Sequence, residues 1–343
     1  MIRTIVTPID GSLHALTALD LSTDLAARYD AQLVLLNIGV RDDNVPEELY
    51  NAASRELKEA ESSGKETGVP PHQSQRLRVL GYLGHMLLDN ARRHAESKGV
   101  QRVETVVDLG NAGERIVHHA KQRSADLIVM GSRGFGELEG LVLGSVSHKV
   151  FHLAPCSCVT VEHKGGQPAL DGFKHILVPT DGSDQADKAV DLASDIAAKT
   201  GSKLFLMYVM SRGPSLEKLR ASIDMDQLSE SARDELDPAL HPIAEHVSSA
   251  FIPPVVSRNA LNEIGEQVLA RGQQTAEAKG VEVAGLNVID GDPARKIIQI
   301  AKREKADLIA MGSRGLGGAE GLLNGSVSYK VSHAAPCSCM VVR

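Results

Sequence analysis

Two stretches of the chain have residue types that can hold phosphate groups. Residues 131–145 and 312–326 each read Gly-Ser-Arg-Gly, nine further residues and Gly-Ser. Glycines that end a strand and open a helix let backbone N–H groups face an anion, and a serine can add a hydroxyl donor. Each stretch is therefore a candidate phosphate site. The alternative is a tight connection followed by a helix, with no ligand.

The motif occurs twice because the second half of the chain repeats the first. Asp10-Gly11-Ser12 returns as Asp181-Gly182-Ser183 at an offset of 171, and from Gly84, which matches Gly265, the offset is 181. The second copy thus has ten extra residues, between about 210 and 257. The repeat predicts two domains, 1–163 and 173–343. The polar segment 164–172, with Gly and Pro, is the expected linker.

Composition excludes several classes of protein. The 343 residues are 42% hydrophobic and 24% charged, as in soluble globular proteins, and the net charge is −7. The acidic balance, the 3% of aromatic residues and the absence of Trp disfavour nucleic-acid binding. No apolar run reaches the roughly 18 residues of a membrane span, and the N-terminus does not resemble a signal peptide. We therefore expect a cytoplasmic protein with reduced cysteines and no membrane contact.

Strands and helices are expected to alternate within each copy. Unbroken apolar strands in such an order predict a parallel sheet covered on both faces, so we expect two tandem doubly wound α/β domains, each with five parallel strands flanked by helices. The expected strands are Thr4–Pro8, Leu33–Ile38, Val103–Asp108, Leu127–Met130 and Cys156–Val161, then Ile176–Pro179, Lys203–Val209, Val281–Ile289, Leu308–Met311 and Cys337–Val342.

Helices are expected between these strands. Apolar residues recur at helical spacing after each first strand, and the helices Gly84–Lys98 and Gly265–Lys279 would end at Gly99 and Gly280. Asn111 and Asp292 are expected to cap the helix after each third strand. Ligands of parallel sheets bind beyond the carboxyl ends of the strands, where the Gly-rich stretches and the acidic residues Asp10 and Asp181 would lie.

These motifs together resemble the universal stress protein family. The likeness rests on the glycine pattern after an Ala-Asp-Leu-Ile strand, the aspartate near the end of the first strand, and the His-x-Ala-Pro-Cys sequence before the last strand. It covers both halves, so the chain resembles a tandem member. The resemblance implies a fold like that of the adenine nucleotide alpha hydrolases. It also implies binding of an adenine nucleotide (ATP, ADP or AMP), with or without Mg.

The resemblance also implies the site residues of each copy. The aspartate would lie beside the nucleoside, a residue near the end of the second strand would face adenine, and the Gly-rich stretch would hold ribose and phosphates. In the first copy these residues are Asp10, Ile38, Gly131, Gly134, Gly144, Ser145 and Ser147. In the second they are Asp181, Val209, Gly312, Gly315, Gly325, Ser326 and Ser328.

The two copies differ in ways that favour the second as the ATP site. Gly110 to Gly113 leave the first copy's helix start more flexible, whereas the second copy has Pro293 there. The first Gly-rich stretch also carries two glutamates, Glu137 and Glu139, against Glu320 alone in the second. Carboxylates repel triphosphate unless a divalent cation intervenes.

Several polar residues have a structural reading beside the functional one. Asp10 and Asp181 could instead satisfy turn N–H groups and the following helix. Arg133 and Arg314 could clamp phosphate or lie on the surface, and Lys149 and Lys330 are expected to face solvent. No general base or nucleophile accompanies either aspartate, so we do not expect an enzyme, although slow ATP hydrolysis is compatible with the motif.

The four cysteines invite a metal-site hypothesis. His152, Cys156 and Cys158 recur as His333, Cys337 and Cys339. Residues two apart on a strand share one face, and Cys is common in buried strands, so core packing is the favoured reading and no metal site is expected.

The predicted function is therefore a stress-response regulator or sensor that binds an adenine nucleotide. The alternative is an interaction scaffold with empty clefts or another ligand. An adenylating enzyme is disfavoured because no Ser-Gly-Gly-x-Asp-Ser loop follows the first strand. The copies are expected to form an intramolecular pseudo-dimer, which could pair again as a homodimer, and the protein partner is unknown. The variable segments 41–76 and 211–256 are expected to be surface helices and loops, with charged stretches at 47–65 and 216–234 that could be helical. Such segments are where a family member acquires partner specificity, but they contain no recognisable peptide motif.

Overall fold

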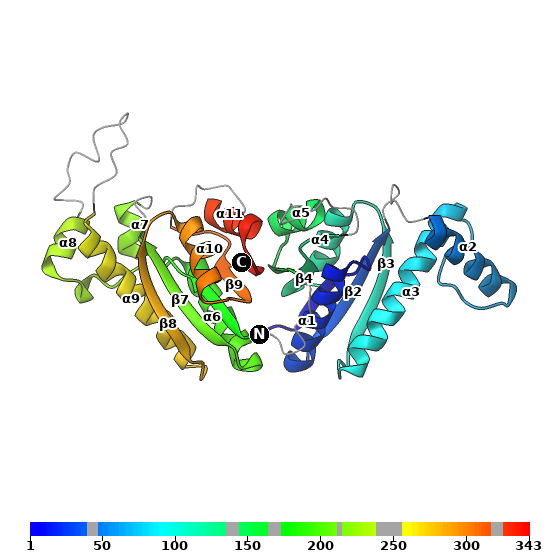
Figure 1. The fold of residues 1–343 in the computed structure, drawn as a ribbon, viewed down its shortest axis with the longest axis horizontal. Helices are drawn as coiled ribbons and strands as arrows, with labels where there is room; N and C mark the ends of the chain where they lie inside the picture. Colours follow the sequence, from blue (N-terminus) through cyan, green and yellow to red (C-terminus); the bar gives the residue numbers. More distant parts are fainter. Residues whose placement is uncertain (40–46, 135–143, 164–172, 211–214, 238–255, 317–324) are drawn as a thin grey trace, which may run out of the picture. The chain divides into compact units, whose positions relative to one another are not determined.

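The computed structural model describes residues 1–39, 47–134, 144–163, 173–210, 215–237, 256–316 and 325–343. The chain divides into two compact units, Met1–Leu170 and Asp171–Arg343. Each unit is a parallel sheet flanked by helices (Figure 1). The expected linker 164–172, the three glutamates of the Gly-rich stretches and parts of both variable segments lie outside the described residues.

The first unit has the strand order β3-β2-β1-β4-β5, and its neighbouring strands are parallel. The chain runs outward from β1 in one direction and then returns to β4 on its other side. The strands are β1 (Thr4–Pro8), β2 (Gln32–Gly39), β3 (Val103–Leu109), β4 (Leu127–Gly131) and β5 (Ser157–Val161). The helices are α1 (Leu13–Tyr29), α2 (Glu47–Ser62), α3 (Gln75–Ser97), α4 (Ala112–Gln122) and α5 (Ser145–Leu153).

The second unit repeats this order as β8-β7-β6-β9-β10, again with parallel neighbours. The five-stranded, doubly wound prediction is therefore confirmed for both units. The strands are β6 (His175–Pro179), β7 (Lys203–Met210), β8 (Val283–Asp290), β9 (Leu308–Gly312) and β10 (Ser338–Val342). The helices are α6 (Asp184–Thr200), α7 (Leu216–Ala221), a short 3-10 turn (Met225–Gln227), α8 (Glu230–Leu236), α9 (Arg258–Glu277), α10 (Pro293–Arg303) and α11 (Ser326–Ala334).

Helices cover both faces of the first unit's sheet. On β2, Val34 and Leu36 belong to a buried cluster that includes Ile116 of α4 and Val150 of α5. Asn37 points to the opposite face, because side chains alternate along a strand. There α3 approaches so closely that a Cβ on Gly84 would lie 2.5 Å from the Asn37 Oδ1 atom.

Some helix boundaries differ from the predictions. The helices expected to begin at Gly84 and Gly265 begin earlier, at Gln75 and Arg258. The expected stretch 47–65 forms α2, but 216–234 is broken into α7, the 3-10 turn and α8. The break follows Ala221, where Asp224 caps the 3-10 turn and Ser229 accepts the Ala232 N–H to start α8.

The capping residues and helix stops were predicted correctly. Asn111 accepts a hydrogen bond from the Glu114 N–H at 3.2 Å, and Asp292 accepts one from the Arg295 N–H at 2.9 Å. Gly99 and Gly280 follow their helices with φ of 93° and 73°, the left-handed region that favours glycine.

The cysteines lie in the cores of the two units. All four are buried thiols outside any disulfide, and Cys156 and Cys158 pack with Val150 and Ala154. Across the described residues, no group of three His, Cys, Asp or Glu side chains is placed to hold a metal ion.

Two glycines allow the helix after each first strand to approach the neighbouring strand. A Cβ on Gly312, the last residue of β9, would lie 2.7 Å from the Gln185 carbonyl carbon and 2.9 Å from the Ala186 N. Gly131 stands in the same relation to His14 and Ala15. The obstructing atoms are mostly backbone in the first turn of α6 or α1, so a side chain cannot move aside to make room. The first glycine of each motif therefore has a packing role.

We predict that Gly312→Ala destabilises the protein by about 1–3 kcal/mol, the usual cost of overpacking. The measurement is urea unfolding followed by circular dichroism. Gly81→Ala is the matched control, since Gly81 is helical and its Cβ would meet Val69 at 3.6 Å, an ordinary contact. That control should be neutral or stabilising. Equal midpoints for Gly312→Ala and the unsubstituted protein would contradict the packing role.

Candidate functional site

A cavity in the second unit lies at the carboxyl ends of β6, β7 and β9. Its volume is about 310 Å³, at the lower end of the roughly 300–1,000 Å³ typical of small-molecule sites. It lies where the strand order reverses, between β6 and β9, which is the usual ligand position in such sheets. All seven site residues predicted for the second copy line it: Asp181, Val209, Gly312, Gly315, Gly325, Ser326 and Ser328.

One end of the cavity is the N-terminus of α11. Gly325 is the N-cap and has no side chain to cap the helix. Its own N–H donates to the Ser313 carbonyl at 2.7 Å. Ser326, Val327 and Ser328 form the first turn and border the cavity. First-turn N–H groups have no partner inside their helix, and the helix dipole favours negative charge there. Negative charge is therefore favoured at this end of the cavity.

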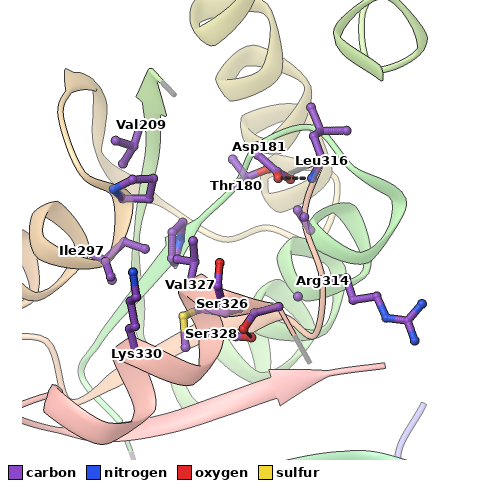
Figure 2. A pocket seen from close by; sticks show the side chains of 18 of the residues that line it. Thr180, Asp181, Val209, Ile297, Arg314, Leu316, Ser326, Val327, Ser328 and Lys330 are labelled. Carbon is purple, nitrogen blue, oxygen red and sulfur yellow. Dashed lines mark hydrogen bonds between the residues drawn. The ribbon is translucent and has the colours of Figure 1, made fainter. Parts of the chain in front are cut away.

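Lys330 adds a positive charge to the cavity lining, on the side of Ile297. It lies four residues after Ser326, on the same face of α11, and Figure 2 shows its side chain extending beside Ile297. The expectation that Lys330 faces bulk solvent is thus incomplete: it is exposed, and it lines the cavity. The four-residue spacing from Ser326 could have predicted that Lys330 lies on the cavity side of the helix.

Asp181 joins two segments that are far apart in the sequence. Its Oδ1 accepts the Ser183 N–H at 3.1 Å and the Ser183 hydroxyl at 2.7 Å, at the start of α6. Its Oδ2 accepts the Leu316 N–H at 2.6 Å, in the loop after β9 (Figure 2). A Cβ on Gly315 would collide with Oδ2. The second glycine of the motif therefore makes room for this carboxylate, which borders the cavity and also fixes its wall.

The other end of the cavity is largely apolar. Val209 of β7 and Ile297 of α10 lie on this side (Figure 2), and Pro293 and Ala294 complete it. Tyr208, 3% exposed, also lines the cavity. Burial, and secondarily the charge of Asp181, raise the pKa of the Tyr208 phenol, so it stays protonated at neutral pH. The sequence analysis did not predict Tyr208 as a site residue, because the matching residue of the first copy is Asn37.

The hydroxyls of the inner serines are used within the protein. The Ser328 Oγ donates to the Gly325 carbonyl at 3.0 Å or the Ser313 carbonyl at 3.3 Å. Ser147 makes the same two contacts in the first unit, at 2.9 and 2.7 Å. These serines hold the glycine turn against the strand end, so their hydroxyl protons are not available to a ligand.

The site residues predicted for the first unit lie on the same strand ends and helix start as those of the second unit. Asp10 accepts the Ser12 N–H at 2.9 Å, and a Cβ on Gly134 would lie 2.7 Å from its Oδ2 atom. Gly144 is the N-cap residue of α5 and makes no side-chain capping hydrogen bond, and Ser145 lies in the first turn. Ile38 lies near the end of β2, in register with Asp108 of β3.

Two cations of the first unit, Arg133 and Lys149, are paired with carboxylates. Arg133 contacts Glu162, and the Lys149 Nζ lies 2.7 Å from Glu114 and 3.2 Å from the Asn111 Oδ1. Burial, opposed by Glu162 and reinforced by Arg133, lowers the pKa of His14, so this imidazole is neutral at pH 7. In the second unit, Arg314 is exposed and its side chain points away from the cavity (Figure 2).

The candidate site thus lies in a doubly wound α/β fold, at the carboxyl ends of the strands, between a helix N-terminus and an apolar wall. The universal stress protein family profile matches residues 1–162 and 172–343. The chain therefore belongs to the universal stress protein family, as a tandem member with two such domains. This confirms the resemblance predicted from the motifs.

Individual relatives agree with this assignment. Universal stress protein YxiE of Bacillus subtilis is 36% identical over 165 residues, covering 47% of this chain and 99% of that protein. Universal stress protein Rv2623 of Mycobacterium tuberculosis is 28% identical over 251 residues, covering 73% of this chain and 68% of that protein. A solved universal stress protein from Archaeoglobus fulgidus shares the fold over 99% of this chain and 98% of its own, with a TM-score of 0.59 at 20% identity.

No helix in the described parts of the chain is both long and apolar enough to span a bilayer.

We predict that Asp181→Ala releases the loop after β9. Removal of the carboxylate leaves the Leu316 N–H without its acceptor, so this amide should exchange with deuterium at least tenfold faster. Hydrogen exchange read by NMR or mass spectrometry measures this directly. Asp10→Ala in the first unit is the control and should leave Leu316 unchanged. Undiminished protection of Leu316 in Asp181→Ala would show that the loop is held by other contacts.

Proposed function

We propose that the chain is a stress-response regulatory protein that binds an adenine nucleotide in the second unit's cavity. The observation that carries the proposal is the convergence of the α11 N-terminus, Lys330 and an apolar wall on one cavity. Phosphates would lie at the first two, and the base would lie against Val209, Ile297 and Pro293. Membership of the family and the predicted site residues are compatible with this ligand.

The anion end is matched to phosphate rather than to a carboxylate alone. Several first-turn N–H groups border it, the Lys330 ammonium lines the same cavity, and a phosphate has enough oxygens to accept from more than one donor. Asp181 and Asp292 also border the cavity. Their charges would repel a polyphosphate, so a divalent cation bound to the phosphates would strengthen ATP binding.

The first unit is proposed to bind the same ligand more weakly or not at all. Lys149, the counterpart of Lys330, is paired with Glu114, and Arg133 is paired with Glu162. Recruiting either cation to a phosphate would first break an existing ion pair. His14 adds no positive charge because it is neutral at pH 7.

We do not propose a dedicated enzyme. Both carboxylate oxygens of Asp181 accept hydrogen bonds from the protein, the Ser328 proton is used internally, and Tyr208 stays protonated. None of these groups is prepared to activate water or a nucleophile. Ligand occupancy would instead act by changing conformation or partner choice, in a cytoplasmic setting. An intramolecular pseudo-dimer and an unidentified protein partner remain part of this proposal.

We predict that Lys330→Ala weakens ATP binding about tenfold, the effect of losing a charged contact worth about 1.4 kcal/mol. Isothermal titration calorimetry with ATP, ADP and AMP measures it. Lys149→Ala is the matched control in the first unit and should bind ATP as the unsubstituted protein does. If no nucleotide binds the unsubstituted protein, the proposal fails and the scaffold alternative is favoured.

We predict that chelation of Mg²⁺ by EDTA weakens ATP binding several-fold and changes AMP binding little, because AMP carries less charge near Asp181 and Asp292. The same titration in the two buffers tests this. A phosphate-release assay run beside it should detect no sustained turnover. Rapid hydrolysis that is lost in Asp181→Ala would contradict the regulatory proposal and indicate an enzyme.

A further inference from the structure

A second cavity, of about 500 Å³, lies in the first unit between α1 and α3. It shares no residue with the nucleotide site predicted for that unit. Leu19, Leu87 and Ala91 contribute apolar surface. Leu13 and Leu16 line it while remaining 62% and 44% exposed, which is unusual for two leucines one turn apart on a helix. This apolar surface is what an occupant would cover.

The repeat shows how the second unit treats the same place. The counterparts of Leu13 and Leu16 are Asp184 and Asp187, and the counterpart of Asn90 is Arg271. The second unit thus has acids where the first unit has exposed leucines, and a long cationic side chain where the first unit has Asn90.

Arg271 occupies the corresponding position between α6 and α9. Its guanidinium donates to the Gly182 carbonyl at 3.1 Å and to the Ser222 carbonyl at 2.8 Å, and it pairs with Asp187 at 3.1 Å. A Cβ on Gly182 would lie 3.4 Å from the guanidinium. The second unit therefore fills this space with one of its own side chains. In the first unit, Gly11 lines the cavity without that side chain, because residue 90 is the shorter Asn90.

Polar groups of the first unit's cavity are suited to accept hydrogen bonds. The Thr17 hydroxyl donates to the Leu13 carbonyl at 2.9 Å, and the His163 Nδ1 lies 3.0 Å from the same oxygen. In the tautomer that carries its proton on Nδ1, His163 donates to Thr17 and its Nε2 is an acceptor. Asp20 lies on the same lining, with its Oδ1 2.8 Å from the His94 Nε2. Its second oxygen adds another acceptor.

We propose that this cavity binds a small organic amine or guanidine with an apolar body. The body would cover Leu13, Leu16 and Leu87, in the place that the Arg271 side chain fills in the second unit, and the head would donate to Asp20 and His163. This inference does not depend on nucleotide binding by either unit.

Calorimetry of the full chain with three probes of one shape tests the proposal. The probes are 1-naphthylmethylamine, 1-naphthalenemethanol and 1-naphthoate, which carry a cationic, a neutral and an anionic head. We expect the amine to bind at one site per chain and naphthoate to bind at least tenfold more weakly. Saturating ATP should leave amine binding unchanged, which separates this site from the nucleotide cavity.

The sequence of the second unit suggests a variant that should fill the cavity of the first. Leu16→Asp with Asn90→Arg copies the second unit's pair, fills the cavity and should reduce amine affinity at least tenfold. Leu153→Asp is the matched control, since Leu153 is also 44% exposed but lies on α5, and it should bind as the unsubstituted protein does. Circular dichroism confirms that each variant is folded.

A third variant tests the head group. Asp20→Asn should weaken the amine several-fold more than the alcohol, because only the amine gains from the carboxylate charge. The proposal is overturned if the amine does not bind, if the filled variant binds it unchanged, or if naphthoate binds as tightly as the amine.

Discussion

The close approach of two backbone segments at the end of the central strands is the constraint on which each unit depends. The helix after the first strand packs against the last residue of the fourth, and only a glycine there leaves space. In the second unit the Asp181 carboxylate then joins residues 135 positions apart. The cavity wall, the beginning of the Gly-rich stretch and the start of the helix are therefore set by one contact region. The glycine motif serves this packing as well as any ligand.

Much of the fold could be predicted because the sequence contains two copies of the same pattern of strands and helices. Where both copies agree, as in the strands and in the caps Asn111 and Asp292, the pattern was sufficient. The starts of α3 and α9 were missed, since the copies match only from Gly84 and Gly265 onward and the helices begin earlier. In the site, Lys330 and Tyr208 escaped prediction because their roles depend on which face of an element borders a cavity. Motif spacing gives that information only when the element itself is already placed.

The duplication has conserved the framework while allowing its surfaces to diverge. The same strand order and glycine turns carry a partly apolar, cation-bearing cavity in the second unit and ion-paired cations in the first. Conversely, the space beside α1 is open and apolar, whereas its counterpart beside α6 contains Arg271. Because the backbone is shared, these differences isolate the contribution of single side chains. Each unit thus serves as the natural control for the other.

The buried thiols give this arrangement a useful physical consequence. Cys158 and Cys339 lie in the last strand of each unit and are at most 2% exposed, so an alkylating reagent can reach them only when that strand opens. Where opening is a rapid pre-equilibrium, the alkylation rate is proportional to the population of the open state. Peptide mapping of the modified cysteines would therefore yield a separate opening free energy for each unit of the native chain, without any introduced label.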